Sequence, residues 1–101
     1  MALVKLLDAN RLPEGQVVEV RIGERQVAVS HVRGKFYAVE GKCPHNGGPL
    51  GLGALHGQQI VCPWHGWEFD CRTGACGFSE TSIPTYPVRI SGGTLWADID
   101  A

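Results

Sequence analysis

Two short boxes, each with one cysteine and one histidine, constrain this chain more than any other feature. One residue separates Cys43 from His45, sixteen residues follow His45, and two residues separate Cys62 from His65. Two thiolates and two imidazoles can hold either one tetrahedral Zn²⁺ or a diiron–disulfide cluster. Zinc modules usually bring two cysteines on one loop and two histidines on another. One cysteine and one histidine per loop favours a two-iron cluster, with each loop spanning both irons, and the zinc site remains the alternative.

The boxes lie in a glycine-rich middle segment. Most of the 14 glycines and all four cysteines fall between residues 41 and 77. Glycines that follow each ligand pair can adopt positive φ and let backbone amides approach the sulfurs of a cluster. Cys71 and Cys76 lie outside both boxes and flank a predicted turn. They are interpreted either as small packed side chains or as a disulfide, and a reducing cytosol favours the first interpretation.

The segments on either side of this region are typical of short antiparallel strands. Valine and aromatic residues nearly alternate with polar ones in these segments, and glycine-containing turns end each segment. This pattern predicts strands over 16–22, 26–32 and 36–39 and a hairpin of 86–90 with 94–99. Residues 8–12 are predicted to form one helical turn capped by Asp8, and no window has the apolar stripe of a long helix. We therefore predict a single all-β domain, residues 1–101. Its scaffold comes from residues 1–40 and 84–101, and residues 41–83 form an inserted cluster-binding segment.

Composition excludes several kinds of partner. The chain has 101 residues and a formal net charge of −1, whereas nucleic acids and anionic membranes select a basic excess. No apolar run approaches the ~20 residues that span a bilayer. The N-terminus lacks a basic region followed by a long apolar segment, so no secretion signal is predicted and a cytoplasmic location is expected.

The two boxes closely resemble the paired cluster motifs of the Rieske family. The matching stretches are C-P-H-N-G at 43–47, C-P-W-H-G-W at 62–67 and F-D-x-x-T-G at 69–74. The resemblance covers nearly the whole chain and implies a Rieske fold, an antiparallel β-sandwich or barrel-like scaffold with an inserted cluster-binding subdomain. It also implies one [2Fe–2S] cluster, with Cys43 and Cys62 on the inner iron and His45 and His65 on the outer iron. The residues expected to cover the cluster are Pro44, Gly47, Gly48, Pro49, Leu50, Trp64, Gly66 and Trp67.

Departures from the high-potential branch of that family predict a low reduction potential. Respiratory members add a cysteine to each box and join them by a disulfide, but the matching positions here are Gly48 and Trp64. The same branch has a serine and a tyrosine whose hydroxyls hydrogen-bond cluster sulfurs, where this chain has Trp67 and Phe69. Fewer donors stabilise the reduced cluster less, so we expect a potential near about −150 mV rather than about +300 mV.

By this resemblance the chain is similar to the soluble Rieske-type ferredoxins of oxygenase systems. It is expected to be a monomer that passes single electrons, in transient contacts, from a flavin-containing NAD(P)H-dependent reductase to a terminal Rieske oxygenase. The alternative is the small subunit of a nitrite-reductase-like complex. We do not expect an enzyme. The family's oxygenase subunits need a second iron, held by two histidines and a carboxylate in a further domain, and here only His31 and His56 remain.

Overall fold

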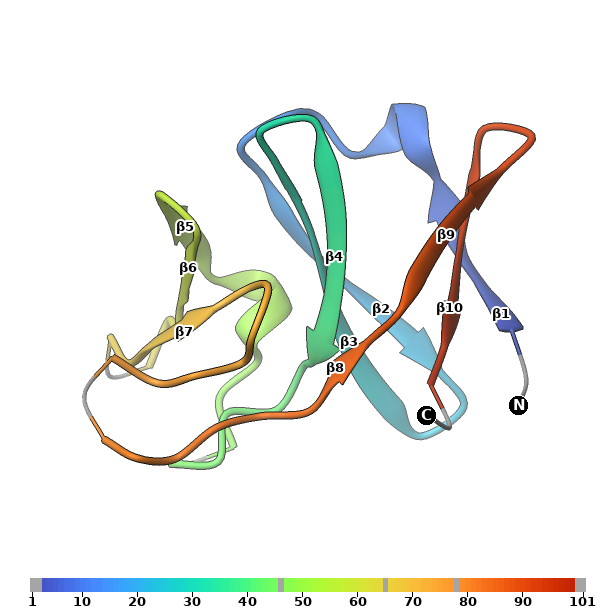
Figure 1. Ribbon diagram of the computed structural model, residues 1–101. Helices are drawn as coiled ribbons and strands as arrows, with labels where there is room; N and C mark the ends of the chain where they lie inside the picture. The colour runs from blue at the N-terminus through green and yellow to red at the C-terminus, as the bar shows by residue number, and fades with distance from the viewer. Residues whose placement is uncertain (1–2, 46, 65, 78, 100–101) are drawn as a thin grey trace.

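The computed structural model describes residues 3–45, 47–64, 66–77 and 79–99. Within these residues the chain forms ten strands in three antiparallel sheets, two short 3₁₀ helices and no α-helix (Figure 1). The strands are β1 (Leu3–Asp8), β2 (Val17–Ile22), β3 (Arg25–Val32), β4 (Lys35–Glu40), β5 (Ala54–His56), β6 (Gln59–Val61), β7 (Glu68–Asp70), β8 (Thr85–Tyr86), β9 (Val88–Ser91) and β10 (Thr94–Asp98). The predicted all-β class is confirmed.

The four-stranded sheet β2-β3-β4-β8 is the middle layer of the molecule. The sheet β1-β10-β9 lies on one side of it, and the small sheet β5-β6-β7 of the glycine-rich segment lies on the other (Figure 1). Successive residues of β3 point to opposite faces: Val27 and Val29 join one hydrophobic cluster and Ala28 joins the other. This strand is therefore buried on both faces and connects the scaffold core to the core beneath the boxes.

Two details differ from the sequence-based prediction. The helical turn is a 3₁₀ helix, Ala9–Arg11, but Asp8 makes no side-chain capping bond to it. Instead its carboxylate accepts a hydrogen bond of 3.1 Å from the hydroxyl of Thr94. The segment 86–90 is not one strand, because it divides at Pro87, which has no amide hydrogen to donate to a ladder. β8 before it pairs with β4, and β9 after it pairs with β10.

Two glycines allow the cluster-binding segment to lie directly on the middle sheet. The second 3₁₀ helix, Leu50–Leu52, packs against β2, and a Cβ on Gly51 would lie 2.5 Å from the Cα of Glu19. A Cβ on Gly41 would similarly lie 2.8 Å from the backbone carbon of Gln26. Real Cβ atoms do not approach this closely, so glycine is required at both contacts.

The turn between β3 and β4 is held by one carboxylate. Glu14 accepts hydrogen bonds from the backbone amides of Arg33 and Gly34, and Arg33 has the unusual φ of +51° for a residue other than glycine. We expect Glu14→Ala to lower the free energy of unfolding by about 1–2 kcal/mol, because two charge-assisted bonds at a half-exposed site are lost. Denaturant unfolding followed by far-UV circular dichroism measures this change. Glu24→Ala, in the exposed turn after β2, is the control, and equal losses in both variants would contradict the assignment.

Within the described residues no helix is long and apolar enough to cross a bilayer.

Candidate metal centre

The first box forms a six-residue loop that its own backbone closes. The amide of Cys43 donates to the carbonyl of Gly48 over 2.8 Å, and the amide of Gly47 donates to the carbonyl of Cys43 over 2.7 Å. Gly47 has a φ of +80°, a conformation that a side chain would strain. At the base of the loop, Lys42 and Pro49 pair as an isolated antiparallel bridge, so both ends of the loop are held together.

The second box repeats this design over the six residues that start at Cys62. The amide of Cys62 donates to the carbonyl of Trp67 over 2.8 Å, and the amide of Gly66 donates back to the carbonyl of Cys62 over 3.0 Å. The φ of Gly66 is +76°. The predicted positive φ after each ligand pair is thus confirmed at Gly47 and Gly66. The two loops have the same length and the same closing bonds.

The cysteines and the first histidine differ sharply in exposure. Cys43 and Cys62 are only 1% and 2% exposed, and they share one hydrophobic cluster. Its other members include Leu50, Ile60 and Phe69. His45, two residues after Cys43, is exposed, while His65 lies outside the residues that the structure describes. The described part of the site therefore places its thiols in the core and its imidazole at the surface.

An aromatic contact joins the two loops. The imidazole of His45 stacks on the indole of Trp67 with ring centroids 4.2 Å apart and planes 6° from parallel. Trp67 in turn contacts Phe69 at 6.4 Å between centroids, and Phe69 is fully buried. Sequence reasoning placed Trp67 over the cluster but missed this contact, because nothing local relates residues 22 positions apart.

The other residues expected to cover the cluster lie at different depths. Pro44 is exposed, Pro49 is half-buried and Gly48 is buried. Leu50 is fully buried and belongs to the core. Trp64 is 57% exposed, so most of its ring faces the surroundings of the protein.

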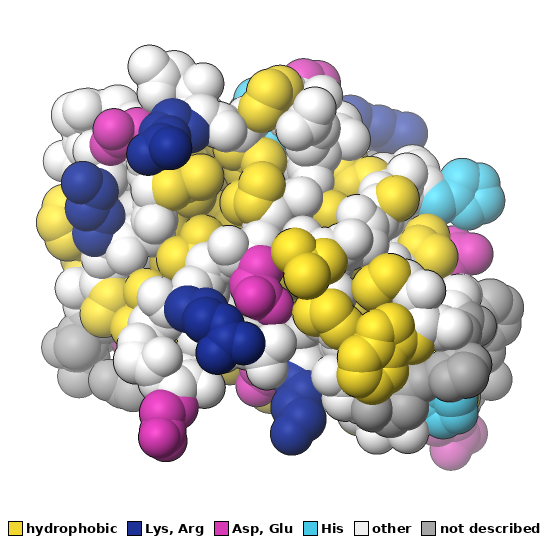
Figure 2. Space-filling model, turned by 180° about the vertical axis from the view of Figure 1, so that it is seen from behind, with side chains coloured by type: hydrophobic (Ala, Val, Ile, Leu, Met, Phe, Trp, Pro, Cys, Tyr) yellow, Lys and Arg dark blue, Asp and Glu magenta, His cyan; other side chains and the backbone are white. Residues whose placement is uncertain are grey.

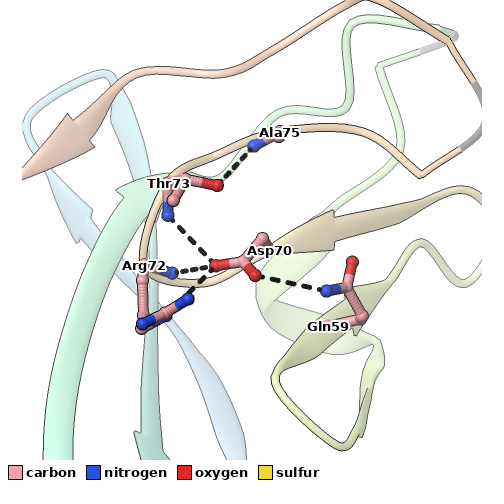
Figure 3. A network of polar contacts seen from close by, with 5 residues as sticks. All are labelled: Gln59, Asp70, Arg72, Thr73 and Ala75. Carbon is pink, nitrogen blue, oxygen red and sulfur yellow. Dashed lines mark hydrogen bonds and ion pairs between the residues drawn. The ribbon is translucent and has the colours of Figure 1, made fainter.

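A third loop is organised by the carboxylate of Asp70 (Figure 3). One oxygen of Asp70 accepts from the amides of Arg72 at 2.8 Å and Thr73 at 3.1 Å. The other oxygen lies 3.4 Å from the side-chain amide nitrogen of Gln59 on β6. The hydroxyl of Thr73 accepts from the amide of Ala75. The turn predicted between Cys71 and Cys76 is therefore confirmed, but the sequence did not reveal that Asp70 of the F-D-x-x-T-G motif holds it.

The two remaining cysteines are buried and unbridged. Cys71 and Cys76 are 1% and 9% exposed, and neither forms a disulfide. Both observations agree with the interpretation of these cysteines as small packed side chains. Burial raises the pKa of the Cys71 thiol above its ordinary value.

The histidines outside the boxes have ordinary partners. His31 Nδ1 donates to the carbonyl of Leu12 over 2.8 Å, and its ring stacks on Phe36 with centroids 4.0 Å apart. His56 is exposed and lies 3.4 Å from a carboxylate oxygen of Glu68.

Comparison with known proteins decides between the two interpretations of the boxes. The sequence profile of the Rieske [2Fe–2S] domain matches residues 2–87. This chain belongs to the Rieske [2Fe–2S] family. Its cofactor is accordingly a [2Fe–2S] cluster, and the alternative of a zinc site is excluded. A similar Rieske protein is the ferredoxin component of a naphthalene 1,2-dioxygenase system from Pseudomonas aeruginosa. It is 36% identical over 90 residues, which cover 87% of this chain and 86% of the relative.

Solved structures share the same architecture. The ferredoxin of Sphingomonas yanoikuyae B1 superposes with a TM-score of 0.87 at 31% identity, over 96% of this chain and 98% of that one. A chain from the complex of reduced oxygenase and oxidized ferredoxin in carbazole 1,9a-dioxygenase gives 0.86 at 31% identity, over 94% and 91%. A protein described as an NADH-dependent nitrite reductase small subunit, from Mycobacterium tuberculosis, gives 0.85 at 22% identity, over 95% and 93%, and shares the fold alone.

The described residues of this Rieske protein fit a [2Fe–2S] cluster. Each of the two matched loops would supply one buried thiol to such a cluster. The difference between buried cysteines and an exposed histidine suits unlike ligands on the two irons. The described candidates Cys43, Cys62 and His45 are thus placed as such a cluster would require, and the four-residue ligand set stays a prediction.

Proposed function

We propose that this chain is a Rieske-type ferredoxin that carries single electrons from a flavin-containing NAD(P)H-dependent reductase to a terminal Rieske oxygenase. The observation that carries the proposal is the pair of matched loops, which hold two thiols in the core and an imidazole at the surface. Ferredoxin components of dioxygenase systems among its relatives support the same role. The protein is an electron carrier and not a catalyst. We further propose that it acts as a cytoplasmic monomer and as one domain, with residues 41–83 as the cluster-binding segment.

The ligands that we assign to the cluster are Cys43, His45, Cys62 and His65. When bound, the cluster supplies a centre that gains and loses one electron. The chain's own contribution is to position the ligands. The two loops place their thiols in the core, while the ring of His45 reaches the surface. A short distance between an imidazole and a docked partner favours fast electron transfer. We propose a potential at the low end of the Rieske range, since Trp67 and Phe69 have no hydroxyl to donate to sulfur.

The surface around the boxes suits a transient partner. Pro44, Pro63 and Trp64 are exposed around the cysteine loops, and Leu52 on the neighbouring 3₁₀ helix is 66% exposed. Figure 2 shows hydrophobic side chains over both halves of this face, including a group on the half that carries the cluster-binding segment. A small apolar patch of this kind is typical of short-lived electron-transfer contacts. We propose that the terminal oxygenase docks here, as an oxygenase and a ferredoxin form a complex in carbazole 1,9a-dioxygenase.

The experiment that tests this function measures the cluster and its transfer of electrons. We expect the dithionite-reduced protein to give a rhombic electron paramagnetic resonance signal with a low average g value. We also expect the reductase of a naphthalene dioxygenase system to reduce it and the matching oxygenase to reoxidise it. Absence of the signal, or bound zinc in its place, would contradict the proposal. In size-exclusion chromatography a monomer is expected, whereas a stable complex with a nitrite reductase would favour the alternative.

Trp64 is expected to dominate docking. Large aromatic side chains at the centre of an interface carry much of its binding energy, so Trp64→Ala should slow stopped-flow reoxidation by the oxygenase about tenfold, equivalent to about 1.4 kcal/mol. Ile90→Ala is the matched control, because Ile90 is 54% exposed on β9, outside the cluster-binding segment. The paramagnetic signal should be unchanged in both variants. Equal slowing in the two would show that docking is not centred on Trp64.

A further inference from the structure

We infer that Trp67 is a positioning residue that fixes the imidazole of His45 across the two loops. This inference rests on the proposed function, since His45 is taken as a ligand. Its geometric basis is the stack of the two rings, with centroids 4.2 Å apart and planes within 6° of parallel. A near-parallel contact at this distance restricts the ring plane of the histidine, because rotation about its side-chain bonds would break the overlap.

The matched design of the loops shows why this position is special. In each loop the sixth residue closes the loop by accepting a hydrogen bond from the cysteine amide, and this residue is Gly48 in the first loop and Trp67 in the second. The backbone role is therefore the same, and glycine is sufficient for it. The indole is an addition in one loop only, and it reaches the histidine of the other. Its contribution is thus separable from loop closure.

The indole can orient the imidazole because the core orients the indole. Trp67 is half-buried and its ring contacts Phe69 at 6.4 Å, with an angle of 37° between the planes. Phe69 is fully buried and is held on both sides, pairing with Ile60 on β6 and with Cys76 across the third loop. The Asp70 turn follows immediately (Figure 3). A continuous series of contacts therefore runs from the core through Phe69 and Trp67 to an exposed histidine.

This arrangement has a consequence for ligand geometry. Hydrogen-bonded partners outside the ligand set orient metal-bound imidazoles, and losing one commonly costs about 10–100-fold in metal affinity. A stacked ring restricts the same rotation of the imidazole, so we expect an effect at the lower end of that range. The exposed position of His45 makes the effect larger, since a surface side chain on a turn otherwise populates several rotamers. Trp67 reduces the entropy that His45 loses when it becomes a ligand.

The test compares three variants of the holoprotein. Trp67→Leu removes the ring, Trp67→Phe retains an aromatic face, and Trp96→Leu removes another half-buried indole, on β10 and outside the cluster-binding segment. In Trp67→Leu we expect the visible absorption to disappear about tenfold faster in the presence of an iron chelator, and the g values of the reduced protein to shift. Trp67→Phe should restore both properties toward the parent, and Trp96→Leu should leave both unchanged.

Pulsed paramagnetic resonance of the parent protein gives an independent readout if Trp67→Leu does not fold. An imidazole held in one orientation gives one narrow set of ¹⁴N couplings for His45, identified by its loss in His45→Cys. A broad distribution of those couplings would overturn the inference, as would identical g values and identical loss rates in Trp67→Leu and Trp96→Leu. Either result leaves the proposed function intact. Absence of a reduced cluster in the parent protein would instead overturn the proposed function itself.

Discussion

Replacing Cys62 with alanine is expected to yield a colourless protein that binds no [2Fe–2S] cluster. The same result is expected for Cys43→Ala, because each loop supplies one buried thiol and no other described thiol lies on the two loops. Iron–sulfur clusters are held by thiolate ligands, so a protein that loses one of its two ligand thiols should no longer bind the cluster. Iron analysis, visible absorption and the paramagnetic signal of the reduced protein measure the loss.

The chain provides its own controls for this experiment. Cys71 and Cys76 are also buried, at 1% and 9% exposed, and also unbridged, but they lie on the third loop. Cys71→Ala and Cys76→Ala should therefore retain the cluster with unchanged g values, and lose only about 1 kcal/mol of stability for the small volume removed. A folded Cys76→Ala protein without iron would contradict the ligand assignment, and so would a Cys62→Ala protein with normal g values.

The sequence predicted the scaffold well where strands are regular and turns are marked by glycine. Strands predicted at 16–22, 26–32 and 36–39 are found as β2, β3 and β4 within a residue or two. Valine-rich segments separated by short turns leave few alternatives to antiparallel pairing. The family and the all-β class were likewise predictable, because two Cys–His boxes at this spacing are a specific pattern.

Other features depend on contacts that no local pattern specifies. The strands β5, β6 and β7 have three residues each, too few to display alternation. The exchange of sheets at Pro87 is decided by which neighbours β8 and β9 meet. β1 was not predicted as a strand, although it pairs with β10 along most of its length. The sequence therefore predicted best those elements whose partners are adjacent in the chain.

The candidate site shows the same division between local and distant information. Positive φ at Gly47 and Gly66 follows from local chemistry and was predicted. The contact of His45 with Trp67 joins separate loops and was not. The motif at 69–74 was noted as a resemblance, but its mechanical role emerged only from the bonds that Asp70 makes to the amides that follow it. The assignment of Cys43, His45, Cys62 and His65 as ligands stays a prediction.

The turn after Asp70 leads to the second large expected effect. Gly74 has a φ of +77°, and a Cβ at this position would lie 2.1 Å from the carbonyl oxygen of Ile83. Ile83 cannot easily withdraw, because its own amide donates to the carbonyl of Gly74 over 2.9 Å and its side chain is buried in the core beneath the boxes. We expect Gly74→Ala to lower the free energy of unfolding by about 3 kcal/mol, combining left-handed strain with overpacking. Denaturant unfolding of the holoprotein, followed by far-UV circular dichroism, measures the change.

Gly93→Ala separates the two causes. Gly93 has nearly the same φ, +78°, but a Cβ there would meet nothing within 4 Å, so this variant should lose only about 1 kcal/mol, the cost of left-handed backbone for a residue with a side chain. The difference between the two variants then isolates the crowding against Ile83. In Gly74→Ala the third loop must move to relieve the contact, and the loop pairs with Phe69 through Cys76. Cluster loss should therefore be faster in Gly74→Ala than in Gly93→Ala. Equal stability and equal cluster retention in the two variants would contradict this prediction. They would show that the third loop moves without disturbing Phe69, and that the core beneath the boxes does not depend on the packing of Gly74 against Ile83.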